Sequence, residues 1–197
     1  MVQPRVICLI AIGANLPSQA GSVEDTLALA QELLANGDIQ IMAHSRIYRT
    51  PAFPPGSGPD FVNAALKIST DLAPAKLLAR LHEIEATLGR NRVRRWEARM
   101  IDLDLLSYGD MVLPNQETFL RWHDMPLSQQ QTETPDALIL PHPRLHERGF
   151  VLVPLLDIAP DWRHPVLGLT VTQMHVALPD GACASIEIVS PARDTRA

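Results

Sequence analysis

Two aspartates on one predicted strand are the residues of this chain best suited to hold a divalent cation. Asp102 and Asp104 alternate with aliphatic residues in the stretch 100–108. Residues two apart on a strand point to the same side, with roughly 6.6–6.8 Å between their Cα atoms. Such a pair can bind one or two Mg²⁺ ions, which keep waters and take phosphate oxygens as further ligands. A strand with one solvated face would show the same alternation, so the pair alone leaves both interpretations open.

A group of arginines directly before this pair favours the phosphate interpretation. Residues 90–99 contain five arginines and one acid, Glu97, in a chain whose formal net charge is −5. Guanidinium groups bind phosphates through paired N–H donors, which makes such a group typical of a polyphosphate clamp. A solvated charge run or a salt-bridged loop is the alternative. Nucleic-acid binding is less favoured, because the strands lack the aromatic-rich RNA-binding signature. The arginines are Arg90, Arg92, Arg94, Arg95 and Arg99.

Two further segments could bind a ligand. Phe61 and Asn63 share the more polar face of a predicted strand, where a ring to stack on and an amide suit a flat heterocycle. They could instead cover a helix and cap a turn. His142 is held between two prolines near Arg148, which favours a phosphate contact over an ordinary surface histidine. If a strand begins at this segment, Arg148 and Phe150 would project from the same face of that strand. Neither glycine-rich nucleotide fingerprint, GxxxxGK[ST] or GxGxxG, is present.

Hydrophobic periodicity predicts the elements that position these residues. Continuous or alternating apolar runs predict strands over 5–12, 39–48, 61–69 and 100–108, and helical spacing predicts helices over 23–34 and 74–88. The order βαββαβ with short turns indicates an α+β fold of the ferredoxin-like type, with a mostly antiparallel sheet. Residues 111–139 show little periodicity and are interpreted as an extended surface insertion. The chain reads as one domain, 1–197, with a core of about 5–165 and a C-terminal extension of about 166–197.

Composition restricts the class of protein. The chain of 197 residues has 46% hydrophobic and 20% charged residues, which is typical of a globular domain and excludes wholesale disorder. Its two cysteines, Cys8 and Cys183, exclude a disulfide framework and a zinc site built of thiolates. The longest apolar run near the start is far shorter than the roughly 20 residues that span a bilayer. We therefore expect a cytoplasmic protein with neither membrane nor nucleic-acid partners. The oligomeric state is not indicated.

Taken together, these segments resemble the 6-hydroxymethyl-7,8-dihydropterin pyrophosphokinase family of folate biosynthesis. The matching segments occur in the family's order and cover roughly residues 5–160. They are 11–16 (AIGANL), 48–51 (YRTP), 59–63 (PDFVN), 89–92 (GRNR), 99–104 (RMIDLD) with Trp96, 141–144 (PHPR) and 148–150 (RGF).

The resemblance implies a role for each matching residue. It implies an αβα sandwich on the ferredoxin-like core, with ATP as co-substrate and two Mg²⁺ ions held by Asp102 and Asp104. Phe61 and Phe150 match the aromatic pair that sandwiches the pterin, and Asn63 matches the residue that reads the pterin edge. The other positions are Thr50 and Phe53 in the pterin pocket, Arg90 and Arg99 on the catalytic loops, and Glu85, Arg92, Trp96, His142 and Arg148 as ATP-side contacts.

The sequence departs from the family pattern in several places. Glu97-Ala98 stands where a Gly-Pro pair is usual before Arg99, and His82 replaces a frequent glutamine. The segment 111–139 is longer than the usual hairpin, and residues 166–197 exceed the common C-terminus. None of these departures removes an implied metal ligand or pterin contact.

The resemblance implies transfer of pyrophosphate from ATP to the hydroxymethyl oxygen of the dihydropterin, with release of AMP. Arg90 and Arg99 would neutralise charge on the transferred group and on the departing AMP. Two other classes stay open. One is a ferredoxin-like ligand-binding or regulatory module without turnover, although a sensor needs no paired metal site. The other is RNA binding on the sheet, which would depend strongly on salt.

Overall fold

The protein folds around one antiparallel sheet with helices on both faces. The structure is a computed structural model that describes residues 4–52, 58–89, 100–130 and 132–190. Within these ranges six strands form the sheet in the order β5-β1-β4-β3-β6, and β2 also pairs with β4. The elements are β1 (Val6–Ala14), α1 (Val23–Leu34), β2 (Ile39–His44), β3 (Ile47–Thr50), β4 (Phe61–Thr70), α2 (Pro74–Thr87), β5 (Asp102–Tyr108), α3 (Gln116–Asp124), α4 (Leu127–Gln130), a 3₁₀ turn (Leu145–Glu147), α5 (Gly149–Ile158), α6 (Val171–Val176) and β6 (Glu187–Ser190).

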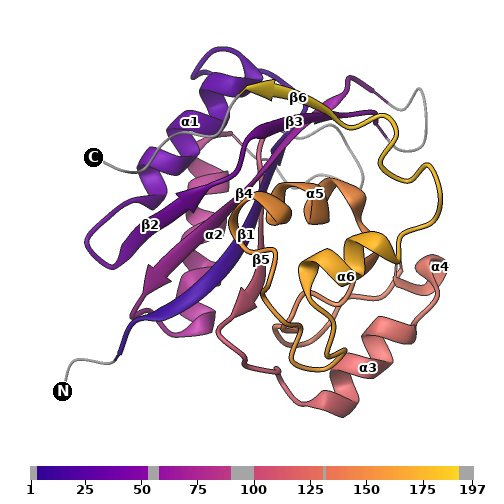
Figure 1. Cartoon of the computed structure of the whole chain (residues 1–197). Helices are drawn as coiled ribbons and strands as arrows, with labels where there is room; N and C mark the ends of the chain where they lie inside the picture. The colour runs from indigo at the N-terminus through magenta and orange to yellow at the C-terminus, as the bar shows by residue number, and fades with distance from the viewer. Residues whose placement is uncertain (1–3, 53–57, 90–99, 131, 191–197) are drawn as a thin grey trace.

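The layers are those of an αβα sandwich. Helices α1 and α2 lie against one face of the sheet, and α5 and α6 lie against the other (Figure 1). This arrangement confirms the α+β class and the ferredoxin-like core predicted from the sequence. In the described part of the chain, no helix combines the length and apolar character needed to cross a bilayer.

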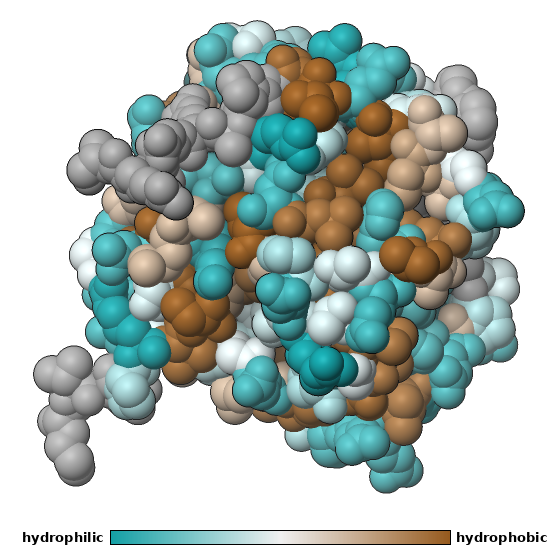
Figure 2. Space-filling view, in the orientation of Figure 1, coloured by the Kyte–Doolittle hydropathy of each residue, from teal (hydrophilic) through white to brown (hydrophobic). Residues whose placement is uncertain are grey.

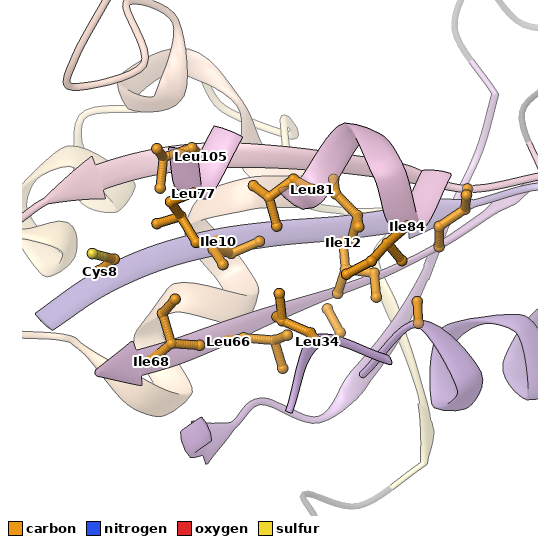
Figure 3. Packing of buried hydrophobic residues seen from close by; sticks show 14 of the residues in the cluster. Cys8, Ile10, Ile12, Leu34, Leu66, Ile68, Leu77, Leu81, Ile84 and Leu105 are labelled. Atoms are coloured by element: carbon orange, nitrogen blue, oxygen red, sulfur yellow. The ribbon is translucent and has the colours of Figure 1, made fainter. Parts of the chain in front are cut away.

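Strand β1 lies between the two helix layers, which explains its continuous apolar sequence. Cys8, Ile10 and Ile12 pack against α1 and α2 in the larger core cluster, as the close view in Figure 3 shows. Leu9 and Ala11 point the other way and pack with the residues of α5 and α6. Alternate side chains of a strand project to opposite faces, so a strand covered on both sides needs apolar residues at every position.

Both helices of the larger core cluster begin as the sequence predicts. Ser22 caps α1, because its side chain accepts the N–H of Asp25 while the Asp25 carboxylate accepts the N–H of Ser22. Pro74 occupies the first turn of α2, where its missing N–H costs no hydrogen bond. Gly89 follows α2 with a φ of +93°, a conformation that residues with a side chain rarely adopt.

The strand predicted over 39–48 is two strands, β2 and β3, separated at Ser45 and Arg46. The backbone N–H of Arg46 donates to Asp157 Oδ2 at 2.9 Å, and the Arg46 guanidinium binds the same carboxylate. The Ser45 hydroxyl accepts the N–H of Ala65 at 2.8 Å. The chain therefore leaves the regular ladder to bind α5, a partner 111 residues away that local periodicity does not reveal.

The prediction of an extended insertion over 111–139 is wrong. This segment contains α3 and α4, and Asn115 caps α3 by accepting the N–H of Thr118 at 2.8 Å. Phe119 and Trp122 are buried on one side of α3 and form a third small apolar cluster with Ile139. Their separation of three residues is a helical signal, but two aromatic residues in a polar sequence are too few to show a clear period.

The stretch after Arg148 is a helix, α5, so Arg148 and Phe150 are not two residues along one strand. The extension after residue 166 also folds onto the domain: α6 packs against α5, and β6 pairs with β3. Helix α5 is apolar on all sides because it lies between the sheet and α6. Such a continuous apolar run fits a buried strand and a buried helix equally well, which is why periodicity could not distinguish them.

A buried histidine lies beside the apolar cluster of α3. His164 is 1% exposed, and its ring centroid is 5.2 Å from that of Phe119. Its Nδ1 accepts the N–H groups of Val166 and Leu167, both at 3.2 Å, which requires the neutral ring. Burial, together with the nearby His146 and His123, lowers the pKa of His164 to about 4.

We expect the stability of the fold to fall with acidification through His164. The folded state resists protonation, so this contribution is complete above pH 6.5 and is lost as the pH falls toward about 4. In His164→Asn, the side-chain oxygen can accept the same two N–H groups without titrating. Urea denaturation should therefore show an acid slope reduced by up to roughly 1.4 kcal/mol per pH unit. His175→Asn on α6 is the matched control, and an unchanged slope in His164→Asn would contradict the assignment.

Candidate functional site

The predicted site residues come together on the face of the sheet that α5 covers. Asp102 of β5 pairs with Gly13 of β1, and Gly13 pairs with Asn63 of β4, so the three residues form a row across adjacent strands. Residues that pair across an antiparallel ladder project to the same face. Neighbouring strands are about 4.8 Å apart, which puts roughly 10 Å between the backbones of Asp102 and Asn63.

The two aspartates project together from β5, as their spacing predicts. Asp104 pairs with Ala11, which packs with the apolar residues of α5 and α6, so both carboxylates belong to that face. The Asp104 side chain is 37% exposed, and its Oδ2 lies 3.8 Å from Arg148 Nη1. Asp102 is also partly exposed. The carboxylates are thus accessible to a ligand and face a cation from the start of α5.

Glu85 holds the strand that carries the aspartates. It is 1% exposed on α2, and its Oε1 accepts the N–H of Leu103 at 2.8 Å. Leu103 lies between the two aspartates, so this bond fixes the backbone from which both project. In the structure Glu85 thus contacts the backbone of β5. Its implied contact with ATP stays a prediction.

Asn63 is fixed on the other side of Gly13. Its Nδ2 donates to Thr50 Oγ1 at 2.8 Å, and both side chains are buried. The Oδ1 of Asn63 lies over the backbone of Gly13: a Cβ at residue 13 would be 2.6 Å from it. Glycine is therefore required at this point of β1 to leave room for the amide.

The two predicted aromatic residues lie on different elements. Phe61 is half-buried at the start of β4, where it pairs with Thr50. Phe150 is 42% exposed in the first turn of α5, and the Arg148 guanidinium carbon lies 5.7 Å from the centre of its ring. One turn of chain thus presents an aromatic ring and a cation side by side.

A cavity opens between the end of β3 and the start of α5. Its volume is about 220 Å³, and it is bounded on one side by Thr50, Pro51, Gly149 and Phe150. The opposite side is formed by residues between 181 and 186 of the C-terminal extension. Thr50 thus lines the cavity and also binds the amide of Asn63, which is predicted to read a ligand edge.

His142 lies beside the aspartates as a neutral ring. Its backbone N–H donates to Leu106 of β5 at 2.8 Å, and its Nδ1 accepts the N–H of Arg144 at 3.1 Å. Burial, followed by the positive charge of Arg148, lowers the pKa of His142 to about 3. Any phosphate contact is therefore a hydrogen bond from Nε2–H rather than an ion pair.

Helix α5 is anchored by residues that sequence reasoning missed. Asp157, near its end, accepts hydrogen bonds from Arg46 Nη2 at 2.6 Å and from the Tyr48 hydroxyl at 2.9 Å. Burial and the neighbouring Asp157 raise the pKa of Tyr48 to about 12, so the hydroxyl remains a donor. No local pattern signals this contact. The strand predicted over 5–12 ends before Gly13, whereas β1 continues to Ala14 and so places Gly13 inside the strand. A glycine inside an apolar strand indicates a close approach of another group.

Some predicted residues lie outside the described part of the chain. Phe53 of the implied pterin pocket is one of them. The same holds for the arginine-rich segment and its neighbours, which include Arg90, Arg92, Trp96 and Arg99.

The fold and the site together define a class. The row Asp102–Gly13–Asn63 crosses the sheet of an α+β domain. Two carboxylates, an arginine and a neutral histidine lie toward its Asp102 end. An amide and two aromatic rings lie toward its Asn63 end. These donors suit a metal-dependent phosphoryl transferase that acts on a flat substrate. The family model described as 7,8-dihydro-6-hydroxymethylpterin-pyrophosphokinase (HPPK) matches residues 9–160, and the chain belongs to this family. It is thus a pyrophosphokinase, as its motifs predict.

Individual relatives agree with this assignment. A 2-amino-4-hydroxy-6-hydroxymethyldihydropteridine pyrophosphokinase of Haemophilus influenzae is 34% identical over 156 residues, which cover 79% of this chain and 83% of the relative. The protein of the same name from Synechocystis is 36% identical over 168 residues, covering 84% and 73%. A crystal structure of Plasmodium falciparum HPPK-DHPS has a TM-score of 0.63 at 16% identity and supports the fold. It covers 88% of this chain, which spans only 44% of that longer one.

We expect Gly13→Ala to destabilise the fold through Asn63. The new methyl group would displace Asn63 Oδ1 and break its bond to Thr50, leaving buried polar groups without partners. The free energy of unfolding, measured in urea, should fall by about 1–3 kcal/mol.

Two further variants isolate this contact. Gly37→Ala is the matched control, because nothing lies within 4 Å of a Cβ at residue 37, and its effect should stay within roughly 0.5 kcal/mol. In an Asn63→Ala background the Gly13→Ala change should cost much less, since the clashing oxygen is gone. Equal costs in both backgrounds would show that Asn63 is not the cause.

Proposed function

We propose that this chain transfers pyrophosphate from ATP to the hydroxymethyl oxygen of 6-hydroxymethyl-7,8-dihydropterin and releases AMP. The observation that carries the proposal is the row Asp102–Gly13–Asn63 across β5, β1 and β4. It separates a carboxylate pair from a heterocycle-reading amide by two strand spacings, roughly 10 Å. That distance suits a substrate whose ring edge is bound at one end and whose hydroxyl reacts at the other.

The pterin would occupy the pocket between β3, β4 and α5. Phe61 and Phe150 would stack on its two faces, and Asn63 would pair with donors and acceptors on its edge. Thr50 and Phe53 would complete the lining. The buried bond from Asn63 to Thr50 supports this arrangement, because an amide already held in place loses little freedom when a ligand binds.

The carboxylate pair has the donor chemistry of a magnesium site. Asp102 and Asp104 offer hard oxygen ligands at a partly exposed position, and the described residues contain no group of three or more carboxylates, histidines or cysteines placed to hold a metal ion. Mg²⁺ fits this set, since it keeps several waters and uses substrate phosphates as remaining ligands. We expect two ions, which when bound neutralise phosphate charge and polarise the phosphorus that is attacked.

The remaining residues would bind and neutralise the nucleotide. The Arg148 guanidinium lies 3.8 Å from Asp104 and over the Phe150 ring, and from there it would reach the phosphates. His142 would donate one hydrogen bond from its neutral ring. Arg90 and Arg99 would neutralise the charge on the transferred group and on the departing AMP, by analogy with arginine fingers. Arg92 and Trp96 are assigned to ATP binding, and Glu85 supports β5 from behind.

The reaction is a single displacement at the β-phosphorus of ATP. The hydroxymethyl oxygen forms the new bond to this phosphorus as the bond to the α-phosphate oxygen breaks, and AMP departs with that oxygen. The residues of this chain hold the two substrates in line and exclude water, which would otherwise compete for the phosphorus.

A direct test is the formation of AMP. Incubated with ATP and Mg²⁺, the protein should release AMP only when the dihydropterin is present, and chelation of the metal should abolish this release. A ligand-binding module without turnover would bind the pterin and form no AMP.

The metal assignment predicts that replacing either aspartate by asparagine causes a large loss of turnover. Asp102→Asn and Asp104→Asn should each lower kcat by roughly 10²-fold or more, because each removes a preorganised charge from the reacting phosphates. Thermal unfolding should be nearly unchanged, since both side chains are partly exposed. Asp110→Asn, at an exposed position just after β5, is the matched control and should retain activity. Near-normal turnover in either site variant would refute the assignment.

A further inference from the structure

The C-terminal extension reaches the substrate pocket. After α6 the chain runs through three turns, closed by hydrogen bonds from Ala182 to Pro179, from Ala184 to Gly181 and from Ile186 to Cys183. It then enters β6, which pairs with β3, the strand that ends at Thr50. Figure 1 shows this segment in yellow, leading from α6 to β6. We call residues 181–186 the C-terminal wall. They lie beyond the part of the chain that the family model matches.

The wall packs directly against the start of α5. A Cβ at Gly149 would lie 2.9 Å from Cys183 Sγ and 3.2 Å from the carbonyl oxygen of Ala182. Gly149 is buried by this contact, and Phe150 follows it in the helix. The absence of a side chain at residue 149 therefore lets the wall approach the helix turn that carries the predicted stacking ring.

The wall lines a cavity together with two residues of the predicted pterin pocket, Thr50 and Phe150. Its wall side is formed by Gly181, Ala182, Ser185 and Ile186, and its other side includes Thr50 and Phe150. Figure 2 shows several hydrophobic patches on this face, one of them where Figure 1 places α5 and β6. Both ends of the wall are thus tied to elements of the pocket, through β3 at one end and α5 at the other.

The chemistry of the wall favours one kind of ligand. Its four lining residues are small or apolar, carry no charge and offer one hydroxyl, that of Ser185. Phosphate would require cationic donors, and none of these four residues supplies one. A flat, uncharged ring is the ligand that fits such a surface between an aromatic side chain and a small-residue wall.

We infer that the C-terminal wall forms the outer side of the pterin pocket and limits the width of the ring that can enter. This inference rests on the proposed function, since it assigns the ring to the pterin. It makes Ser185 and Ile186 specificity-determining residues outside the family's matched segments. They act by excluding volume and take no part in the displacement itself.

Ser185→Trp tests the inference by filling the cavity from the wall side. Calorimetry with the dihydropterin, in the presence of Mg²⁺ and a non-hydrolysable ATP analogue, should show affinity weakened by about tenfold or more. The affinity for the ATP analogue alone should be unchanged. Ser128→Trp on α4, at an exposed position, is the matched control and should bind both ligands as the unaltered protein does.

The outcomes separate the inference from the proposed function. Dihydropterin affinity within twofold of the unaltered protein would overturn the inference, as would an equal loss for both ligands. If Ser185→Trp does not fold, Ser185→Leu makes the same test with less added volume and should weaken only dihydropterin binding. An unaltered protein that binds the dihydropterin but forms no AMP would refute the proposed function, and the binding comparison would still decide the role of the wall.

Discussion

The antiparallel register of β5, β1 and β4 is the constraint on which the site depends. It places Asp102, Gly13 and Asn63 in one row, and shifting a strand by one residue would turn its side chains to the opposite face. Burial specifies the register of β5, because a slip by one residue would exchange the buried Leu103 and Leu105 with its two partly exposed aspartates. Stability and the candidate site thus use the same alternation: Leu103 and Leu105 of β5 face the larger core, and Asp102 and Asp104 face the side of α5.

The second constraint is the position of α5, which closes the site from above the sheet. Its far end is anchored through Asp157 to Arg46 and Tyr48, at the point where β2 and β3 separate. Its near end carries Gly149 and Phe150 against the cavity. A helix that is apolar at nearly every position could slide on an apolar surface, and the partly buried Asp157 carboxylate with its several donors specifies one position. The interruption between β2 and β3 therefore helps to fix the position of α5, and with it the side of the cavity that α5 forms.

Much of this could be predicted from the sequence. The capping box at Ser22, the proline at the start of α2 and the alternation around Asp102 act over a few residues, so local patterns reveal them. The predictions that the structure corrects concern features set by tertiary contacts. Helix α3 is stabilised by the burial of Phe119, and α5 by its position between the sheet and α6. The break at Arg46 is caused by a carboxylate that is distant in the sequence. The structure places the described site residues near one another, and their roles stay predictions. The contact of Gly13 with Asn63 and the position of the C-terminal wall required the spatial arrangement.

The closeness of Arg148 to Phe150 has a consequence for how the two substrates influence each other. The guanidinium lies 3.8 Å from Asp104, Phe150 lines the cavity, and both residues belong to the turn that begins α5. A displacement of this turn by one ligand would alter the surface offered to the other. Thermodynamic linkage then requires the effect to be mutual. If bound nucleotide changes the affinity for the pterin by some factor, bound pterin changes the affinity for the nucleotide by the same factor. Order of addition would be a matter of kinetics, with the same final free energy by either route.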